Sequence, residues 1–135
     1  MKRRVVVTGV GLRSPIGNGP SQVADALRCG RSGVRRAPEW DWIRDLRTRV
    51  AGTAEPDVAS LPRSVRRITG RVGLLAIGAL DDATRDAGIQ REEAAGEDAW
   101  LLVGSTLGAL ADIEQMLVRL RNSGTVLGYE TAGAL

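Results

Sequence analysis

Apolar and polar positions over the first thirty residues predict a buried strand, then a loop, then a helix. Residues 5–7 are three consecutive valines, and such a β-branched run is typical of a strand covered on both faces. Glycines and a proline follow at once, which suits a loop that no helix crosses. A helical pattern starts near Pro20 and Ser21 and continues to Arg28, with Gly30 as its stop. We therefore expect a parallel strand that leads directly into a loop.

The middle of the chain contains the strongest periodic pattern. Residues 31–49 are polar and basic with two tryptophans, which indicates an ordered surface loop with a short helical turn at 41–46. A short strand is expected at 49–54 and a turn at 56–62. Apolar residues then recur at helical spacing across 64–86, and Gly88 stands where a helix stop belongs. Three glycines inside this stretch weaken it, so the helix needs tertiary burial.

The last third predicts a second strand and a further helix. Residues 99–103 read AWLLV, a second buried strand, and a turn rich in glycine and hydroxyl groups follows at 104–108. Leu110, Ile113, Leu117 and Leu120 then lie on one face of a helix that Gly124 ends. The alternation of strands and helices predicts right-handed crossovers and a parallel or mixed sheet.

Composition limits the functional classes. The chain has 135 residues, enough for one domain, with no Phe, one Tyr and 17 Gly, so aliphatic and small side chains must do the packing. All but one of its 19 basic residues are arginine, yet the net charge is only +3, which does not indicate nucleic-acid binding. No segment is long enough and apolar enough to span a bilayer. We expect a cytoplasmic protein with neither a nucleic-acid nor a membrane partner.

Candidate chemistry is sparse. Cys29 is the only cysteine and there is no histidine, so the sequence offers no internal disulfide, no base for a cysteine nucleophile and no metal site. The carboxylates Asp81, Asp82 and Asp86 are expected to form a solvated helix face. The loop residues Thr8, Gly9, Gly11, Ser14 and Asn18 are expected to be structural rather than catalytic.

A dinucleotide-binding loop is a weak alternative for the opening segment. The glycines at 9 and 11 begin a GxGxxG pattern, but Ser14 occupies the place of the third glycine. The helix also begins too late, and no strand ending in an acidic residue follows at the required spacing.

The motifs VVVTGVGLRSPIGN at 5–18 and ALRCGRSGV at 26–34 resemble the amino-terminal signature of the elongating β-ketoacyl-acyl-carrier-protein synthases. The resemblance continues through 65–88 and through VGSTLGAL at 103–110. It implies an α/β, thiolase-like layered fold, a partial amino-terminal half with a mixed sheet and packed helices. Residues 1–135 would be the amino-terminal part of that domain, incomplete at its carboxyl-terminal end, with the tail at 125–135 stopping before the next strand and helix.

This resemblance implies a function for the larger enzyme. Such synthases condense acyl and malonyl units with loss of carbon dioxide in fatty-acid or polyketide synthesis, using a cysteine, two histidines and a lysine that this chain does not supply. We therefore expect the 135-residue chain to be inactive alone. We expect no cofactor, since the substrates are covalently attached to the phosphopantetheine of an acyl carrier protein. Expected partners are that carrier protein and a second synthase subunit, in a homodimer or a heterodimer. The alternative is a non-catalytic partner, resembling a chain-length factor or a truncated homologue.

Two binding sites follow from the same resemblance. Arg63 and Arg67 match basic positions of the family helix whose start docks the acidic carrier protein, and Arg66 adds charge. Arginines in the opening turns oppose the helix dipole, so their clustering favours docking over a merely solvated face. Leu107, in the GSTLG turn, corresponds to a position at the far end of the acyl pocket near the dimer interface. An ordinary core position for Leu107 is equally compatible with the sequence.

Overall fold

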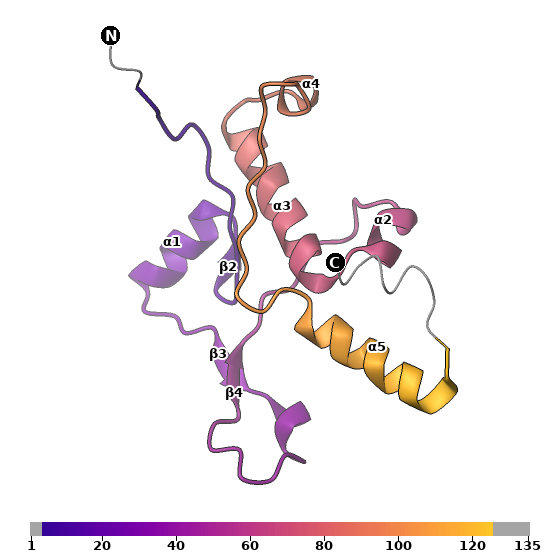
Figure 1. Cartoon of the computed structure of the whole chain (residues 1–135). Helices are drawn as coiled ribbons and strands as arrows, with labels where there is room; N and C mark the ends of the chain where they lie inside the picture. Colours follow the sequence, from indigo (N-terminus) through magenta and orange to yellow (C-terminus); the bar gives the residue numbers. More distant parts are fainter. Residues whose placement is uncertain (1–3, 126–135) are drawn as a thin grey trace.

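The computed structural model describes residues 4–125 and consists of two small hairpins and a set of helices around one central helix (Figure 1). The first hairpin pairs β1 (Arg13–Ser14) with β2 (Gly17–Asn18), so that Arg13 lies opposite Asn18. Helix α1 (Pro20–Arg28) follows, as predicted, with Pro20 in its first turn, where no amide donor is needed. The loop therefore turns back on itself before the helix starts.

The second hairpin pairs β3 (Val34–Arg36) antiparallel with β4 (Val50–Gly52). The strand predicted at 49–54 is thus confirmed at its centre. The tip of this second hairpin contains a 3-10 turn, η1 (Pro38–Trp40). The helical turn predicted at 41–46 is wrong, because the turn forms earlier in the chain, where Pro38 fixes φ in the helical region. Both sheets in the described residues are two-stranded and antiparallel, so the expected parallel crossovers are absent from residues 4–125.

The long helix predicted at 64–86 is two helices. Helix α2 (Arg63–Ile68) ends at Thr69, whose backbone is extended at φ −106° and ψ 120°, and α3 (Arg71–Asp86) begins after Gly70. The pair Thr69-Gly70 has low helix propensity, but Val72-Gly73 and Ile77-Gly78 inside α3 are pairs of the same kind, so propensity alone does not explain the break. Helix α4 (Arg91–Ala94) is short, and α5 (Leu110–Ser123) ends at Gly124, as predicted.

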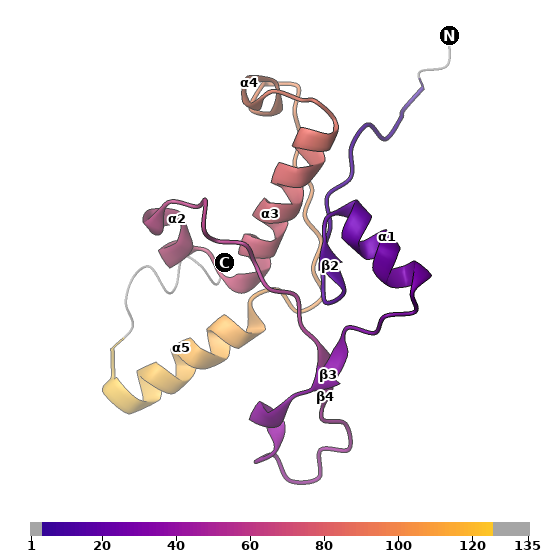
Figure 2. The same ribbon diagram turned by 180° about the vertical axis from the view of Figure 1, so that it is seen from behind.

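The two predicted buried strands are wrong for the chain as it stands. Residues 5–7 and 99–103 are extended but belong to neither sheet, and Val5, Trp100 and Leu102 are 96%, 87% and 89% exposed. Figures 1 and 2 show both segments as uncoiled chain outside any strand arrow. An apolar run becomes a strand only when a neighbour completes its hydrogen-bond ladder, and the described residues supply none for these two.

Little of the chain is buried. Ala26 and Ala37 are the buried apolar residues of the described part, at 0% and 3% exposure. The accessible surface is 11279 Å² for a 14.3 kDa chain, whereas a compact monomer of that mass exposes about 6,800 Å². The helices and hairpins therefore surround α3 without closing a core.

Candidate functional site

Three arginines gather on α2. Arg63, Arg66 and Arg67 stand at helical spacings of three and four residues, and all are exposed. Pro62 precedes the helix, and no side chain caps its start. The sequence therefore placed these arginines correctly on one exposed helical turn.

Leu107 lies in the loop before α5. The Gly108 amide donates a hydrogen bond of 3.0 Å to the Ser105 hydroxyl, and the Leu110 amide donates to the Leu107 carbonyl at 3.2 Å, so the turn is ordered. The Leu107 side chain is 70% exposed, so it is not core in this chain. Among the regular elements of the described part, the closest packing joins β3 with β4, α1 with β2, β1 with β2, and α3 with β1. Neither α2 nor α5 belongs to these pairs.

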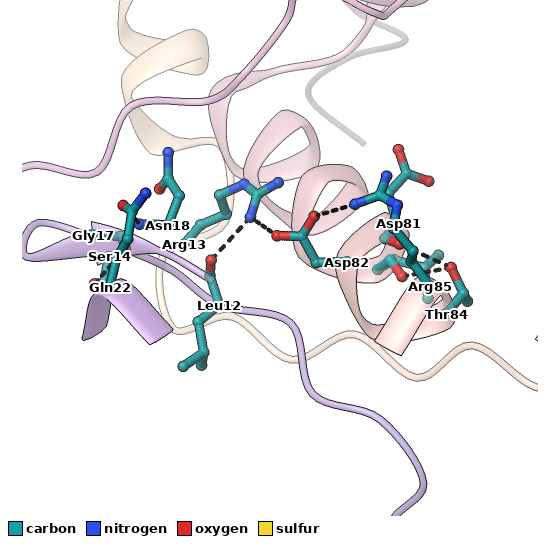
Figure 3. A network of polar contacts seen from close by, with 11 residues as sticks. Leu12, Arg13, Ser14, Gly17, Asn18, Gln22, Asp81, Asp82, Thr84 and Arg85 are labelled. Carbon is teal, nitrogen blue, oxygen red and sulfur yellow. Dashed lines mark hydrogen bonds and ion pairs between the residues drawn. The ribbon is translucent and has the colours of Figure 1, made fainter. Parts of the chain in front are cut away.

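A polar network joins the first hairpin to α3 (Figure 3). The Arg13 guanidinium donates hydrogen bonds to the Asp82 carboxylate and, at 3.0 Å, to the Leu12 carbonyl. Arg85 binds the other carboxylate oxygen of Asp82 at 3.1 Å. The Arg13 side chain is 9% exposed and that of Asp82 is 21% exposed. This pair therefore crosses a largely buried contact between segments 69 residues apart in the sequence.

The same contact includes a backbone hydrogen bond and two glycines. The Val10 amide donates to the Asp86 carboxylate at 3.0 Å. A Cβ on Gly9 would lie 2.2 Å from the Ala83 carbonyl oxygen, and one on Gly11 would lie 1.8 Å from that of Ala79. Only glycine permits so close an approach of a loop to a helix. The structural role predicted for both glycines is thus confirmed.

The predicted solvated carboxylate face of α3 is wrong at Asp82, which is partly buried against Arg13. Asp81 and Asp86 are exposed as predicted, although Asp86 also accepts the hydrogen bond from Val10. Two features could have indicated this contact: Arg13 interrupts an otherwise uncharged loop, and Asp82 and Asp86 are four residues apart on one helical face. Neither feature identifies a partner so distant in sequence.

The hydrogen bond from Arg13 holds the pKa of Asp82 below its ordinary value of 3.8; desolvation opposes this shift, and the charges of Arg13 and Arg85 reinforce it. A carboxyl group whose pKa falls on folding stabilises the fold above its unfolded pKa, and that stabilisation is lost as the pH falls through the folded pKa. The Arg13–Asp82 contribution is therefore complete near neutral pH and disappears in acid, below pH 3.8.

We predict that Asp82→Asn destabilises the loop contact by about 1–3 kcal/mol at pH 7, because it leaves the buried Arg13 charge without a carboxylate. Urea unfolding of the wild-type and variant chains measures the difference. Asp81→Asn, one residue away and exposed, is the matched control and should change little. An equal effect of the two substitutions, or a difference that persists well below pH 3.8, would refute the assignment.

A cavity of about 530 Å³ lies between the two hairpins. Its walls include Asn18, Gln22, Arg35 and Thr53. Pro15 of the first hairpin packs against Gly33, just before the second hairpin, where an added Cβ would lie 2.5 Å from the Pro15 Cβ atom. The rim charges Arg36 and Glu55 are ion-paired with Asp41 and Arg71 at 2.8 and 3.2 Å. The cavity is thus polar, with two of its rim charges already neutralised.

Nucleophile and metal sites find no support in residues 4–125. Cys29 is exposed at the end of α1. No group of three His, Cys, Asp or Glu side chains able to hold a metal ion occurs among the described residues. In the same part of the chain, every helix is too short or too polar to cross a membrane.

The family model described as "Beta-ketoacyl synthase, N-terminal domain" matches residues 2–133, nearly the whole sequence. The chain belongs to the β-ketoacyl synthase family. Its relatives include the 3-oxoacyl-[acyl-carrier-protein] synthase 1 of Haemophilus influenzae, 32% identical over 79% of this chain and 26% of that protein. The tetracenomycin polyketide synthase ketoacyl synthase alpha subunit of Streptomyces glaucescens is 27% identical over 92% of this chain and 29% of that protein.

Solved β-ketoacyl synthase structures confirm the thiolase-like fold class. A β-ketoacyl synthase from Burkholderia phymatum matches with a TM-score of 0.72 and 31% identity over 98% of this chain and 35% of its own. The ishigamide ketosynthase/chain length factor matches with a TM-score of 0.77 and 29% identity over 100% of this chain and 34% of its own. This β-ketoacyl synthase chain spans about a third or less of the length of these relatives.

Proposed function

We propose that this chain is the amino-terminal part of a 3-oxoacyl-[acyl-carrier-protein] synthase of fatty-acid or polyketide biosynthesis. The observation that supports this proposal most strongly is the family match over residues 2–133. Relatives named as synthases of both pathways support the same reading. The whole enzyme would join an acyl group to a malonyl unit with loss of carbon dioxide, in the cytoplasm and without a resident cofactor. The whole enzyme would be a homodimer or a heterodimer of synthase subunits, of which this chain forms a part.

The catalytic groups would come from outside these 135 residues. Condensation in this family needs a cysteine to hold the acyl chain and histidines to stabilise developing negative charge by hydrogen bonding. This chain has no histidine to act as a base, and Cys29 is exposed at the end of α1. Residues 1–135 would therefore contribute binding surfaces and structure rather than reacting atoms.

Carrier docking is assigned to α2. Arg63, Arg66 and Arg67 present positive charge on one exposed turn, and an acidic carrier helix would complement it through charge-assisted hydrogen bonds. Such charges raise the rate of encounter and orient the partner, which would direct the phosphopantetheine arm toward the enzyme.

Leu107 is proposed to limit acyl length near the subunit interface. Its side chain is 70% exposed in this chain, so it is free to line a pocket that another segment or subunit completes. We predict that Leu107→Ala in a complete enzyme shifts the product distribution to longer acyl chains, measured by mass spectrometry of carrier-bound products. Leu117→Ala on α5 is the control for general loss of apolar surface, because Leu117 is also exposed, at 52%. An unchanged product profile would refute this role.

A second candidate function is a non-catalytic partner that binds a carrier protein or another synthase subunit. The observation that favours it is the likeness to the ishigamide ketosynthase/chain length factor, with a TM-score of 0.77. The absence of histidine from this chain is compatible with it. The two candidates differ in whether the complete polypeptide carries a catalytic cysteine.

A condensation assay tests the proposal. The isolated 135-residue chain, supplied with acyl and malonyl carrier protein, should release no carbon dioxide above background. A full-length synthase containing these residues should turn over. Turnover by the isolated chain would contradict the proposal that the catalytic groups lie outside these 135 residues. A full-length polypeptide that binds carrier protein without turnover would favour the second candidate.

A further inference from the structure

The tip of the β3–β4 hairpin, residues 37–49, is an ordered loop with its own hydrogen bonds. The Ala37 amide donates to the Arg49 carbonyl at 2.8 Å, and the Trp40 amide donates to the Ala37 carbonyl at 3.1 Å. Ala37 itself is only 3% exposed in a chain with few buried residues. Because the backbone closes around Ala37, the tip has a defined shape and is not a loosely held connection.

Side chains brace the same tip. Arg36 forms an ion pair with Asp41 at 2.8 Å, and Arg49 donates a hydrogen bond to the Ile43 carbonyl at 3.1 Å. These contacts cross the loop from its base to its outer turn. The backbone of the outer turn is therefore ordered before any partner arrives, which lowers the entropic cost of binding.

The outer turn displays a tryptophan and two arginines. Trp42 is 80% exposed, and Arg44 and Arg47 are exposed and form none of the hydrogen bonds or ion pairs found among residues 4–125. Tryptophan and arginine are the residues most enriched among the dominant contacts of protein interfaces. An exposed tryptophan on the same ordered loop as two arginines that pair with nothing among residues 4–125 is a feature that partner binding would explain.

The charge of the segment indicates the class of partner. Residues 31–49 carry six arginines and three carboxylates, a net excess of three positive charges, equal to that of the whole chain. The carboxylates Glu39, Asp41 and Asp45 lie among the arginines and would repel the continuous phosphate charge of a nucleic acid. A protein surface with separate carboxylates could bind the arginines without lying against Glu39, Asp41 and Asp45. Trp42 would pack against apolar patches of that surface.

We propose that Trp42, Arg44 and Arg47 form a second docking surface for the acidic acyl carrier protein, separate from the arginines of α2. This inference rests on the proposed function, which brings the carrier to this chain. Figures 1 and 2 show the hairpin tip and α2 well apart on the molecule, so one carrier would touch them with different parts of its surface or at different stages of delivery.

The test is the affinity of a full-length synthase that contains these residues for acyl carrier protein, measured by titration calorimetry at low and physiological salt. Trp42→Ala, and separately the pair Arg44→Glu with Arg47→Glu, should each weaken binding about tenfold. Arg121→Glu on α5 is the control for each single reversal, Arg44→Glu or Arg47→Glu, because it changes the charge by the same amount, and it should change the affinity less than about twofold. A circular dichroism spectrum identical to wild type must accompany each variant, and Arg44→Gln with Arg47→Gln should give an intermediate loss if the charge matters.

Each outcome decides between the two docking proposals. If the α2 substitutions weaken carrier binding and the tip substitutions do not, the second surface is wrong while the proposed function stands. If the wild-type synthase does not bind carrier protein, both docking surfaces and the proposed function are wrong. Tip-dependent binding to duplex DNA or to anionic vesicles at least as tight as to carrier protein would overturn the assignment to an acidic protein.

Discussion

Replacing Arg63 and Arg67 with glutamate in a full-length synthase that contains this chain raises KM for the carrier-bound substrate about tenfold or more while kcat changes little. Both side chains stand on the exposed face of α2, so reversal turns an attraction for an acidic helix into a repulsion. A uniform loss of binding affects KM rather than the chemical step.

Steady-state kinetics with malonyl carrier protein as the varied substrate measure this change. Arg121→Glu on α5 is the control for each single reversal, Arg63→Glu or Arg67→Glu, because it changes the charge by the same amount. The increase in KM should shrink as ionic strength rises, because salt screens exposed charges. Unchanged KM, or a kcat that falls together with an unaltered KM, would refute docking at α2.

Substituting alanine for Gly11 is expected to detach the opening loop from α3. The added Cβ would lie 1.8 Å from the Ala79 carbonyl oxygen, and both groups belong to backbone that cannot rotate away. Overpacking of this kind costs about 1–3 kcal/mol or more, and the loop is held by few other contacts: the Arg13–Asp82 pair and the Val10–Asp86 hydrogen bond.

Amide hydrogen exchange measures the detachment. The Val10 amide, bound to Asp86, and the Gly19 amide, bound to the Leu12 carbonyl at 2.8 Å, should lose their protection in Gly11→Ala. Gly104→Ala is the matched control, since nothing lies within 4 Å of a Cβ at that position. Retained protection at Val10 would show that the Gly11 backbone does not lie against the Ala79 carbonyl.

Local pattern predicted the helices because their signals are local. Pro20 and Gly124 mark the ends of α1 and α5 through backbone geometry that each residue imposes by itself. The arginines of α2 were placed by the family resemblance, since the periodic pattern itself begins at residue 64, one residue after the start of α2. The break at Thr69 was missed because the apolar spacing continues across it, and that spacing carries no information about the extended backbone at Thr69.

The local sequence pattern could not predict contacts between residues far apart in the chain. The valines at 5–7 identify a segment with high strand propensity, but propensity does not provide the neighbouring strand that a ladder requires. Likewise the Arg13–Asp82 pair joins positions 69 residues apart, and neither residue alone indicates the other. The sequence resemblance identified the family without locating either contact.

The central claim is that these residues form the amino-terminal part of a larger synthase, and intact mass spectrometry of the protein purified from its own host tests it most directly. Since the chain covers 34–35% of the related solved chains, we expect a polypeptide of about three times 14.3 kDa. A native mass of 14.3 kDa would contradict the claim and favour a short non-catalytic partner.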